Sequence, residues 1–176
     1  MLKLFLGNIC LGKLTNNQTM QISKNKQNYL EIKTKSALIV IDGKITINDV
    51  SLEGAGEYEI GEVSLEGVDD NVYICQGDDI NFAIVNFKEK IDKETIEKLS
   101  SVSLLFARVD ENVDAAIEQV SQIEPSVAVY IGSSSSQSKI KSAGVNFEQK
   151  ESLKLTKKDL EGAENSYFVE IENGGS

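Results

Sequence analysis

Serine and lysine residues near the C-terminal end have types and spacings that could do chemistry. Ser136 and Lys139 have the Ser-x-x-Lys spacing, in which the lysine can activate the serine as a nucleophile. The serine run 133–136 precedes a predicted helix, and an anion could bind at such a helix N-terminus. Both patterns are common in helix caps and exposed loops. We therefore interpret Ser136 and Lys139 as a cap and a solvated surface, and the run 133–136 as a flexible loop.

Acidic residues form a second candidate group. The Asp-Asp pairs 69–70 and 78–79 could bind a hard cation if they converged, but they lack the spacing of a calcium-binding loop and are interpreted as solvated turns. Glu57 and Glu59 alternate with Tyr and Ile, and we favour a structural contact over acid–base catalysis for them. Gly54 and Gly56 lie between predicted strands, so they do not form a dinucleotide-binding fingerprint.

The 176 residues include no histidine. A Ser-His or Cys-His nucleophile pair therefore cannot form within one chain. The two cysteines, Cys10 and Cys75, are expected to be free buried thiols, because a chain without a secretory signal is kept in a reducing compartment. Nothing near Cys10 in the sequence marks it as a reactive thiolate.

The charge balance excludes two classes of partner. Lys and Arg number 18 and Asp and Glu number 28, so the formal net charge is -10. Nucleic acids and anionic membranes both require a basic surface, and we expect neither as a partner. The apolar start of the chain is too short for a signal peptide, and no apolar run reaches the roughly 20 residues that cross a bilayer. We therefore expect a cytoplasmic protein.

Apolar residues in alternating or continuous runs predict strands throughout the first half of the chain. The expected strands are 2–6, 20–23, 30–35, 37–41, 45–47, 50–52, 58–60, 63–68, 72–75 and 80–87. The run 37–41 is apolar throughout, as expected for a strand that is covered on both faces. Asp42 and Gly43 follow it and predict a tight hairpin in which both turn residues have positive φ.

After residue 87 the apolar residues follow a helical period. Asp92 is a predicted N-cap, Pro125 ends the second helix and Gly144 ends the third. The expected helices are 93–98, 113–123 and 136–143, and the expected strands are 102–107, 127–131 and 167–171. This alternation predicts parallel strands with right-handed crossovers. We expect a single domain over 1–172, β-rich over 1–87 and α/β over 88–172, with a flexible tail at 173–176.

Segment 54–61 reads Gly-Ala-Gly-Glu-Tyr-Glu-Ile-Gly and includes Gly54, Gly56, Glu57 and Tyr58. It is similar to the Gly-Pro-Gly-Glu-Tyr-Glu-Ile-Gly segment of metallo-β-lactamase-fold hydrolases, in the bacterial branch of ascorbate-6-phosphate lactonase-like proteins. Weaker similarities to that branch follow the same order along the chain, at 6–10, 63–68, 71–74, 122–125 and 153–160. The resemblance implies the α+β class and an αββα, metallo-β-lactamase-like sandwich that is trimmed in its N-terminal half.

The same resemblance implies that the family's chemistry is lost. Hydrolases of this family hold one or two metal ions with a His-x-His-x-Asp-His loop, two further histidines and a bridging aspartate, and the ions activate a water. That loop has no counterpart here. Ala83 and Asn86 stand where the family has a histidine and the bridging aspartate, and Gly132 stands at the last ligand position. We therefore expect no metal, no cofactor and no metal-dependent hydrolysis.

These patterns support three hypotheses about function. The first is a non-catalytic binding or oligomerising module, in which a second copy or a protein partner covers the apolar strand 37–41 in place of a missing helix. The alternative is a small-molecule-binding or weakly active hydrolase-like protein that uses the vestigial pocket. The third is an enzyme that recruits a metal ion through Asp and Glu alone.

Overall fold

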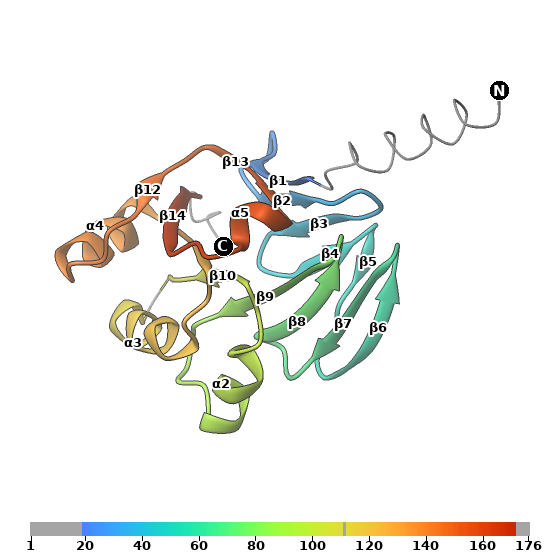
Figure 1. Cartoon of the computed structure of the whole chain (residues 1–176), viewed down its shortest axis with the longest axis horizontal. Helices are drawn as coiled ribbons and strands as arrows, with labels where there is room; N and C mark the ends of the chain where they lie inside the picture. The colour runs from blue at the N-terminus through green and yellow to red at the C-terminus, as the bar shows by residue number, and fades with distance from the viewer. Residues whose placement is uncertain (1–18, 111, 172–176) are drawn as a thin grey trace, which may run out of the picture.

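Two β-sheets face each other across the main core (Figure 1). The computed structural model describes residues 19–110 and 112–171. The six-stranded sheet has the order β13-β1-β2-β3-β4-β5, and its strands are β1 (Thr19–Lys24), β2 (Leu30–Lys33), β3 (Leu38–Ile41), β4 (Ile45–Ile47), β5 (Val50–Ser51) and β13 (Ser152–Thr156). The eight-stranded sheet has the order β12-β14-β11-β10-β9-β8-β7-β6, and its strands are β6 (Gly56–Ile60), β7 (Val63–Gly67), β8 (Val72–Gly77), β9 (Ile80–Asn86), β10 (Leu104–Arg108), β11 (Val127–Gly132), β12 (Glu148–Gln149) and β14 (Asn165–Glu170).

The six-stranded sheet is antiparallel and packs with one face only. Met20 and Ile22 of β1 are fully buried, whereas Gln21 between them is exposed. On β2, Ile32 is fully buried and Lys33 is exposed. This alternation is the period-2 pattern of a sheet that packs on one side and contacts water on the other.

Strand β3 corrects the prediction that the run 37–41 is covered on both faces. Ile39 and Ile41 are buried in the core between the sheets, but Leu38 is 39% exposed and Val40 is partly exposed. The run is continuously apolar because its outer face has two aliphatic side chains where neighbouring strands have polar ones.

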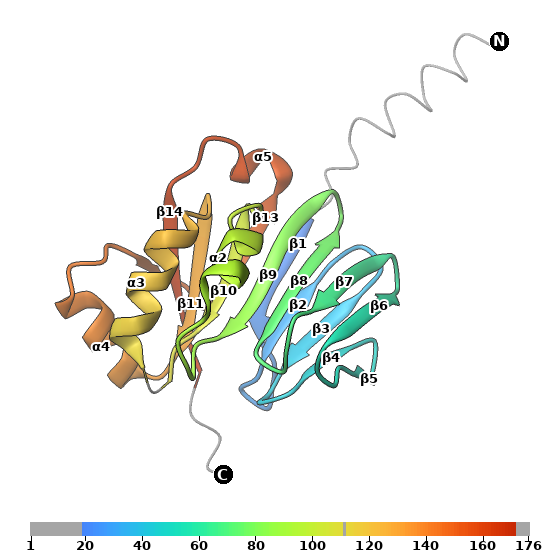
Figure 2. The ribbon, with the colours of Figure 1, turned by 90° about the horizontal axis from the view of Figure 1, so that it is seen from below.

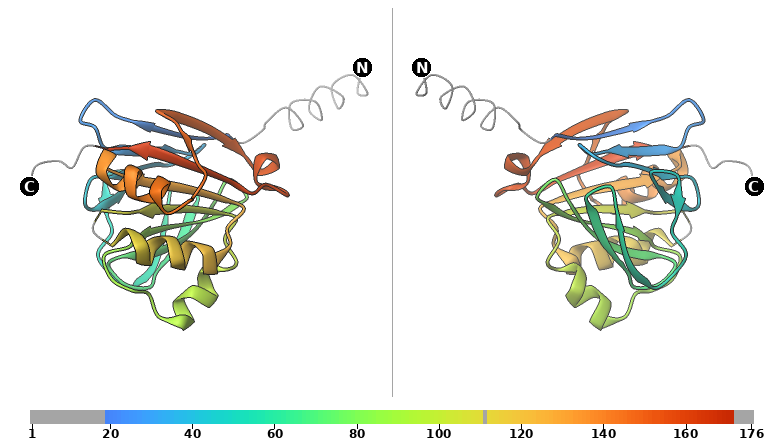
Figure 3. Two further views of the ribbon diagram at one scale, coloured as in Figure 1. Left: turned by 90° about the vertical axis from the view of Figure 1, so that its left-hand side faces the viewer. Right: turned by 90° about the vertical axis from the view of Figure 1, so that its right-hand side faces the viewer.

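Three helices cover the other face of the eight-stranded sheet. They are α2 (Lys93–Leu99), α3 (Val113–Ile123) and α4 (Ser134–Ser142), and they pack on a second apolar cluster. Figure 2 shows them together on one side of the molecule, and Figure 3 places β1 and β2 (blue) on the side opposite α2 and α3. Strands β9, β10, β11 and β14 are parallel, as predicted from the strand–helix alternation. No described helix is long and apolar enough to cross a membrane.

The expectation of an αββα sandwich is wrong. Strands make up 43% and helices 20% of the described residues. Within 19–110 and 112–171, no helix packs on the outer face of the six-stranded sheet; the fourth helix, α5 (Lys157–Leu160), is a single turn next to β13. The physical reason is the polar outer face of that sheet, which needs no helical cover.

The segment 152–160 connects the two halves of the chain. Strand β13 pairs antiparallel with β1, with Leu155 opposite Met20, so a strand from the C-terminal half completes the N-terminal sheet. A capping box then begins α5, in which Thr156 Oγ1 accepts from the backbone N–H of Asp159 and the Asp159 carboxylate accepts from the backbone N–H of Thr156. From the sequence, this segment is covered only by the family resemblance at 153–160, which does not predict the strand.

The turn after β3 differs in type from the prediction. Three residues, 42–44, connect β3 and β4, and of these only Gly43 has positive φ. The Asp42 carboxylate accepts a hydrogen bond from Lys44 N at 3.1 Å, which stabilises the turn locally.

Some predictions fall on residues outside the described part of the chain. These are the strand 2–6, the family-like segment 6–10, Cys10 and the tail 173–176.

Candidate functional site

The family-like segment 54–61 forms the edge strand β6 and the turns on either side of it. Gly54 and Gly56 have positive φ, and the Gly54 carbonyl approaches Gly67 so closely that a Cβ on Gly67 would lie 2.3 Å from it. The Tyr58 hydroxyl donates to the carbonyl oxygens of Glu53 (2.9 Å) and Gly54 (3.2 Å), which fixes the turn before the strand. The structural contact expected from the sequence for Glu57 is therefore made by Tyr58, and Glu57 is exposed.

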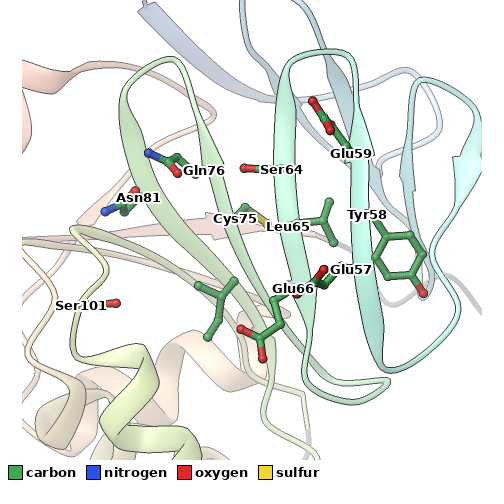
Figure 4. A pocket seen from close by; sticks show the side chains of 11 residues that line it. Glu57, Tyr58, Glu59, Ser64, Leu65, Glu66, Cys75, Gln76, Asn81 and Ser101 are labelled. Atoms are coloured by element: carbon green, nitrogen blue, oxygen red, sulfur yellow. The ribbon is translucent and has the colours of Figure 1, made fainter.

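An open groove lies on the outer face of the eight-stranded sheet, where the helices do not reach. We call it the outer groove; it has a volume of about 610 Å³. Its lining residues are Glu57, Tyr58, Glu59, Ser64, Leu65, Glu66, Ile74, Cys75, Gln76, Asn81 and Ser101. Figure 4 shows Glu57 beside Glu66 and Gln76 beside Asn81, as the strand register requires, with the Tyr58 ring pointing away.

The outer groove is acidic and shallow. Glu57 and Glu66 are directly opposite each other on β6 and β7, an arrangement that is destabilising for like charges. Lys98 of α2 relieves part of this repulsion through a 3.1 Å ion pair with Glu66, in which both side chains remain partly exposed. A solvated acidic face accounts for these contacts.

A second, smaller cavity lies between the two sheets at their edge. We call it the inter-sheet cavity; its volume is about 200 Å³. Its lining residues are Ile41, Gly43, Lys44, Ile45, Leu52, Asp70, Asn71, Tyr73, Ile84, Asn86 and Arg108. It is smaller than the 300–1,000 Å³ typical of pockets for drug-sized ligands, so it suits a smaller molecule.

The topology of the sheet explains why polar residues meet at this cavity. Asn86 and Arg108 are the last residues of the parallel strands β9 and β10 and lie opposite each other in the register. Ligand sites of open α/β sheets form at the carboxyl ends of parallel strands, because the loops that follow leave that edge accessible. Both side chains share the inward face with the buried residues Ile84 and Phe106.

Arg108 is the charged lining residue of the cavity that is least exposed and that forms an ion pair. Its Nε donates to Asp110 Oδ2 at 2.7 Å, and the two side chains are 19% and 21% exposed. In the part of the chain that the structure describes, the Asp110 Oδ1 atom is buried and has no hydrogen-bond partner. Across the cavity, Lys44 supplies a second positive charge and Asp70 a negative charge, and both are exposed at the mouth.

Tyr73 forms part of the wall between the sheets. It is 2% exposed, and its hydroxyl oxygen accepts a hydrogen bond from Gly54 N at 3.3 Å. Burial raises the pKa of the Tyr73 hydroxyl, although the Gly54 hydrogen bond acts in the opposite direction. The hydroxyl therefore stays protonated at neutral pH.

The three positions that the family resemblance marks as lost metal ligands do not form one cluster. Asn86 lines the inter-sheet cavity. Ala83 is fully buried on the other face of the same strand, under the helices. Gly132 ends β11, and a Cβ there would lie 2.6 Å from the Val109 carbonyl oxygen, so close packing is sufficient to require glycine. Among the described residues, no three His, Cys, Asp or Glu side chains are placed to hold a metal ion.

The prediction that the run 133–136 is a flexible loop is wrong, because Ser134–Ser142 form α4 and the run supplies its cap and first turn. Ser133 is the N-cap of α4, and its Oγ accepts from Ser136 N at 3.3 Å. Ser136 is 2% exposed, whereas Lys139 is exposed on the helix surface. This arrangement gives the Ser-x-x-Lys pair no shared site.

The two aspartate pairs are turns, as predicted, and they lie at opposite ends of β8. Asp69 Oδ1 accepts from Asn71 N and Val72 N in the turn before β8. Asp78 and Asp79 both have positive φ and form the two-residue turn after it. The six-residue strand between them separates the pairs by roughly 17–20 Å at about 3.3 Å per residue, so they cannot share a cation.

Arg108 is the functional candidate that sequence reasoning missed. It is the single arginine among 18 basic residues, and that bias was visible in the sequence. Comparison of the chain with protein-family models, curated proteins and solved structures finds no match. The resemblance to metallo-β-lactamase-fold hydrolases therefore stays a prediction.

Proposed function

We propose that this chain is a non-catalytic binding protein whose ligand is a small polar molecule held in the inter-sheet cavity. The observation that supports the proposal most is the placement of Arg108 and Asn86 at the carboxyl ends of β9 and β10, over an apolar wall formed by Leu52 and Ile84. A ligand site of this kind combines apolar contact with a few convergent polar groups. The absence of histidine from the sequence supports a binding role over catalysis.

A thermal-shift screen of the full chain against a panel of small charged and neutral metabolites tests this proposal. A ligand present at 100 times its Kd stabilises the native state by about 2.7 kcal/mol. For a chain of this size that corresponds to a rise in Tm of roughly 5–10 °C. We expect at least one such ligand, and titration calorimetry then gives its Kd.

Two matched variants locate the site of any ligand found. Asn86→Phe places a ring in the inter-sheet cavity, and we expect it to abolish binding. Asn81→Phe makes the same change on the same strand, but in the outer groove, and we expect it to leave the Kd unchanged. Loss of binding in Asn81→Phe alone would move the site to the outer groove, and a panel without a ligand would contradict the proposed function.

Self-association is a second candidate function, and Leu38 is the residue that favours it. Leu38 is 39% exposed on the outer face of the six-stranded sheet, next to the partly exposed Val40. Two aliphatic side chains contribute little of the roughly 800 Å² per partner that a stable interface buries, and their cross-strand neighbours Lys33 and Glu31 are charged. Light scattering on purified protein tests this candidate, and a dimer that Leu38→Ser dissociates would support it.

A further inference from the structure

The guanidinium of Arg108 is held from one side only. Its Nε donates to Asp110 Oδ2 at 2.7 Å, which fixes the plane of the group. No described residue accepts a hydrogen bond from its two terminal nitrogens, and the side chain lines the inter-sheet cavity. A largely buried guanidinium whose two terminal nitrogens can each donate a hydrogen bond matches the two oxygens of a carboxylate.

The rest of the cavity favours a ligand with a short apolar part. Ile41, Leu52 and Ile84 are buried and present aliphatic carbon to the cavity. The cavity volume of about 200 Å³ is below the 300–1,000 Å³ of pockets for drug-sized ligands, so a short chain suits it. A polar group placed against the aliphatic wall would lose its hydration without compensation, so we expect the part of the ligand that lies there to be apolar.

The charges at the cavity favour one negative charge rather than two. Arg108 and Lys44 are positive, whereas Asp70 at the mouth and Asp110 behind the guanidinium are negative. The chain as a whole has a net charge of -10. A dianion such as sulfate meets more repulsion in these surroundings than a monocarboxylate does.

We propose that the inter-sheet cavity binds a short-chain monocarboxylate, with the terminal nitrogens of Arg108 as the carboxylate-binding group and Asp110 as the residue that positions the guanidinium. This inference rests on the proposed binding function and narrows it to a ligand class. Asn86 lies opposite Arg108 in the strand register and also lines the cavity, so its amide is placed next to the guanidinium.

The single arginine provides a specific reporter for this proposal. In an ¹⁵N–¹H correlation spectrum of the full chain near pH 6, the one arginine Nε–Hε cross-peak belongs to Arg108. The probes are butyrate, its neutral analogue butyramide and sulfate, which is a dianion at this pH, at equal ionic strength. We expect butyrate to shift the Arg108 cross-peak and the backbone amides of Ile84 and Asn86 saturably, with a Kd at least tenfold lower than that of butyramide or sulfate.

Each other outcome has a defined meaning. Equal shifts with butyramide, or stronger binding of sulfate, would overturn the carboxylate assignment and leave the proposed binding function standing, because the cavity amides would still report a ligand. No shift with any of the three probes would also overturn the carboxylate assignment. The metabolite panel decides the proposed function independently of these probes.

Two variants test the roles of the individual residues. Arg108→Lys keeps the positive charge but removes the two terminal nitrogens that donate to both carboxylate oxygens. We therefore expect the Kd for butyrate to rise at least tenfold. Lys154→Arg, on the outer face of the six-stranded sheet, is the matched control and leaves the Kd unchanged. Asp110→Asn should move the Arg108 Nε–Hε cross-peak in the free protein and raise the Kd for butyrate. An unmoved cross-peak in a folded Asp110→Asn variant would remove Asp110 from the positioning role.

Discussion

Cys75 shows how the environment of one side chain decides its chemistry. The residue is 2% exposed between the two sheets, and burial raises the pKa of its thiol to about 12. The thiolate is the reactive form, and at pH 8 roughly one thiol in ten thousand would be ionised at that pKa. The raised pKa also means that the protonated thiol favours the folded state below about pH 9, and that this contribution is lost as pH rises toward 12.

We predict that Cys75 of the folded protein resists alkylation. Iodoacetamide at pH 8, followed by peptide mass mapping, should leave Cys75 unmodified under native conditions and modify it fully in guanidinium chloride. Peptide mapping separates Cys75 from Cys10, the other cysteine of the chain. Rapid native labelling of Cys75 would show that the core between the sheets opens on the timescale of the reaction.

Turns with positive φ are the element-scale feature that offers a gain in stability. The turn between β8 and β9 has Asp78 at φ 52° and Asp79 at φ 59°. Two-residue hairpin turns of this kind strongly favour Asp-Gly, because glycine adopts positive φ without a steric cost. Asp78 is held in place by a 2.9 Å hydrogen bond from Lys35 N to its carboxylate, so Asp79 is the position to change.

We predict that Asp79→Gly stabilises the protein by about 0.5 kcal/mol, since relief of the strained φ exceeds the added freedom of the unfolded chain. Chemical denaturation followed by circular dichroism measures the change. Glu89→Gly is the control; Glu89 is exposed, its φ is not positive, and the variant loses the same charge. It should leave the free energy of unfolding unchanged or lower it. Equal effects in both variants would show that charge, rather than turn geometry, is responsible.

The elements that sequence reasoning located correctly are those fixed by local signals. Helix α2 begins after its predicted N-cap Asp92, whose carboxylate accepts from Thr95 N at 2.8 Å, and α3 has the predicted span Val113–Ile123. Strand β13 was missed although Leu153 and Leu155 alternate with Lys154, which is a local strand pattern. Its pairing with β1 could not be predicted, because it joins residues more than 130 positions apart, as Met20 opposite Leu155 shows. No local pattern encodes such a pairing.

The candidate site was predictable only in part, for a related reason. Asn86 was named through a family resemblance and does line the inter-sheet cavity, whereas Ala83, named on the same grounds, lies under the helices. Arg108 is the last residue of β10 and follows the apolar residues 104–107. From the sequence, this position predicts the end of a strand and nothing about a ligand. Its partners are Asp110, two residues away, and a cavity wall that the hairpin β3–β4 contributes from the other sheet.

At the scale of the whole molecule, β13 from the C-terminal half belongs to the sheet of the N-terminal half. We therefore expect the two halves to unfold together as one cooperative unit. The main core contains residues of both sheets, among them Leu155 of β13, Ile32 of β2 and Phe106 of β10. The sequence predicts one domain over 1–172, which stays a prediction; within residues 19–110 and 112–171 the two sheets share this core. A sheet that lost β13 would expose the edge of β1 and part of the core beneath it.

We predict that Leu155→Ala destabilises both sheets equally. Leu155 is 4% exposed, and truncation of such a buried leucine costs about 2–5 kcal/mol. Native-state hydrogen exchange read by mass spectrometry should show the same loss of protection in peptides from β2–β3 and from β9–β10, because the two sheets share one core. Lys154→Ala, on the exposed side of the same strand, is the matched control and should leave protection unchanged. Loss confined to β2–β3 would mean that the six-stranded sheet unfolds separately, and the inter-sheet cavity, which needs both sheets, would then open with it.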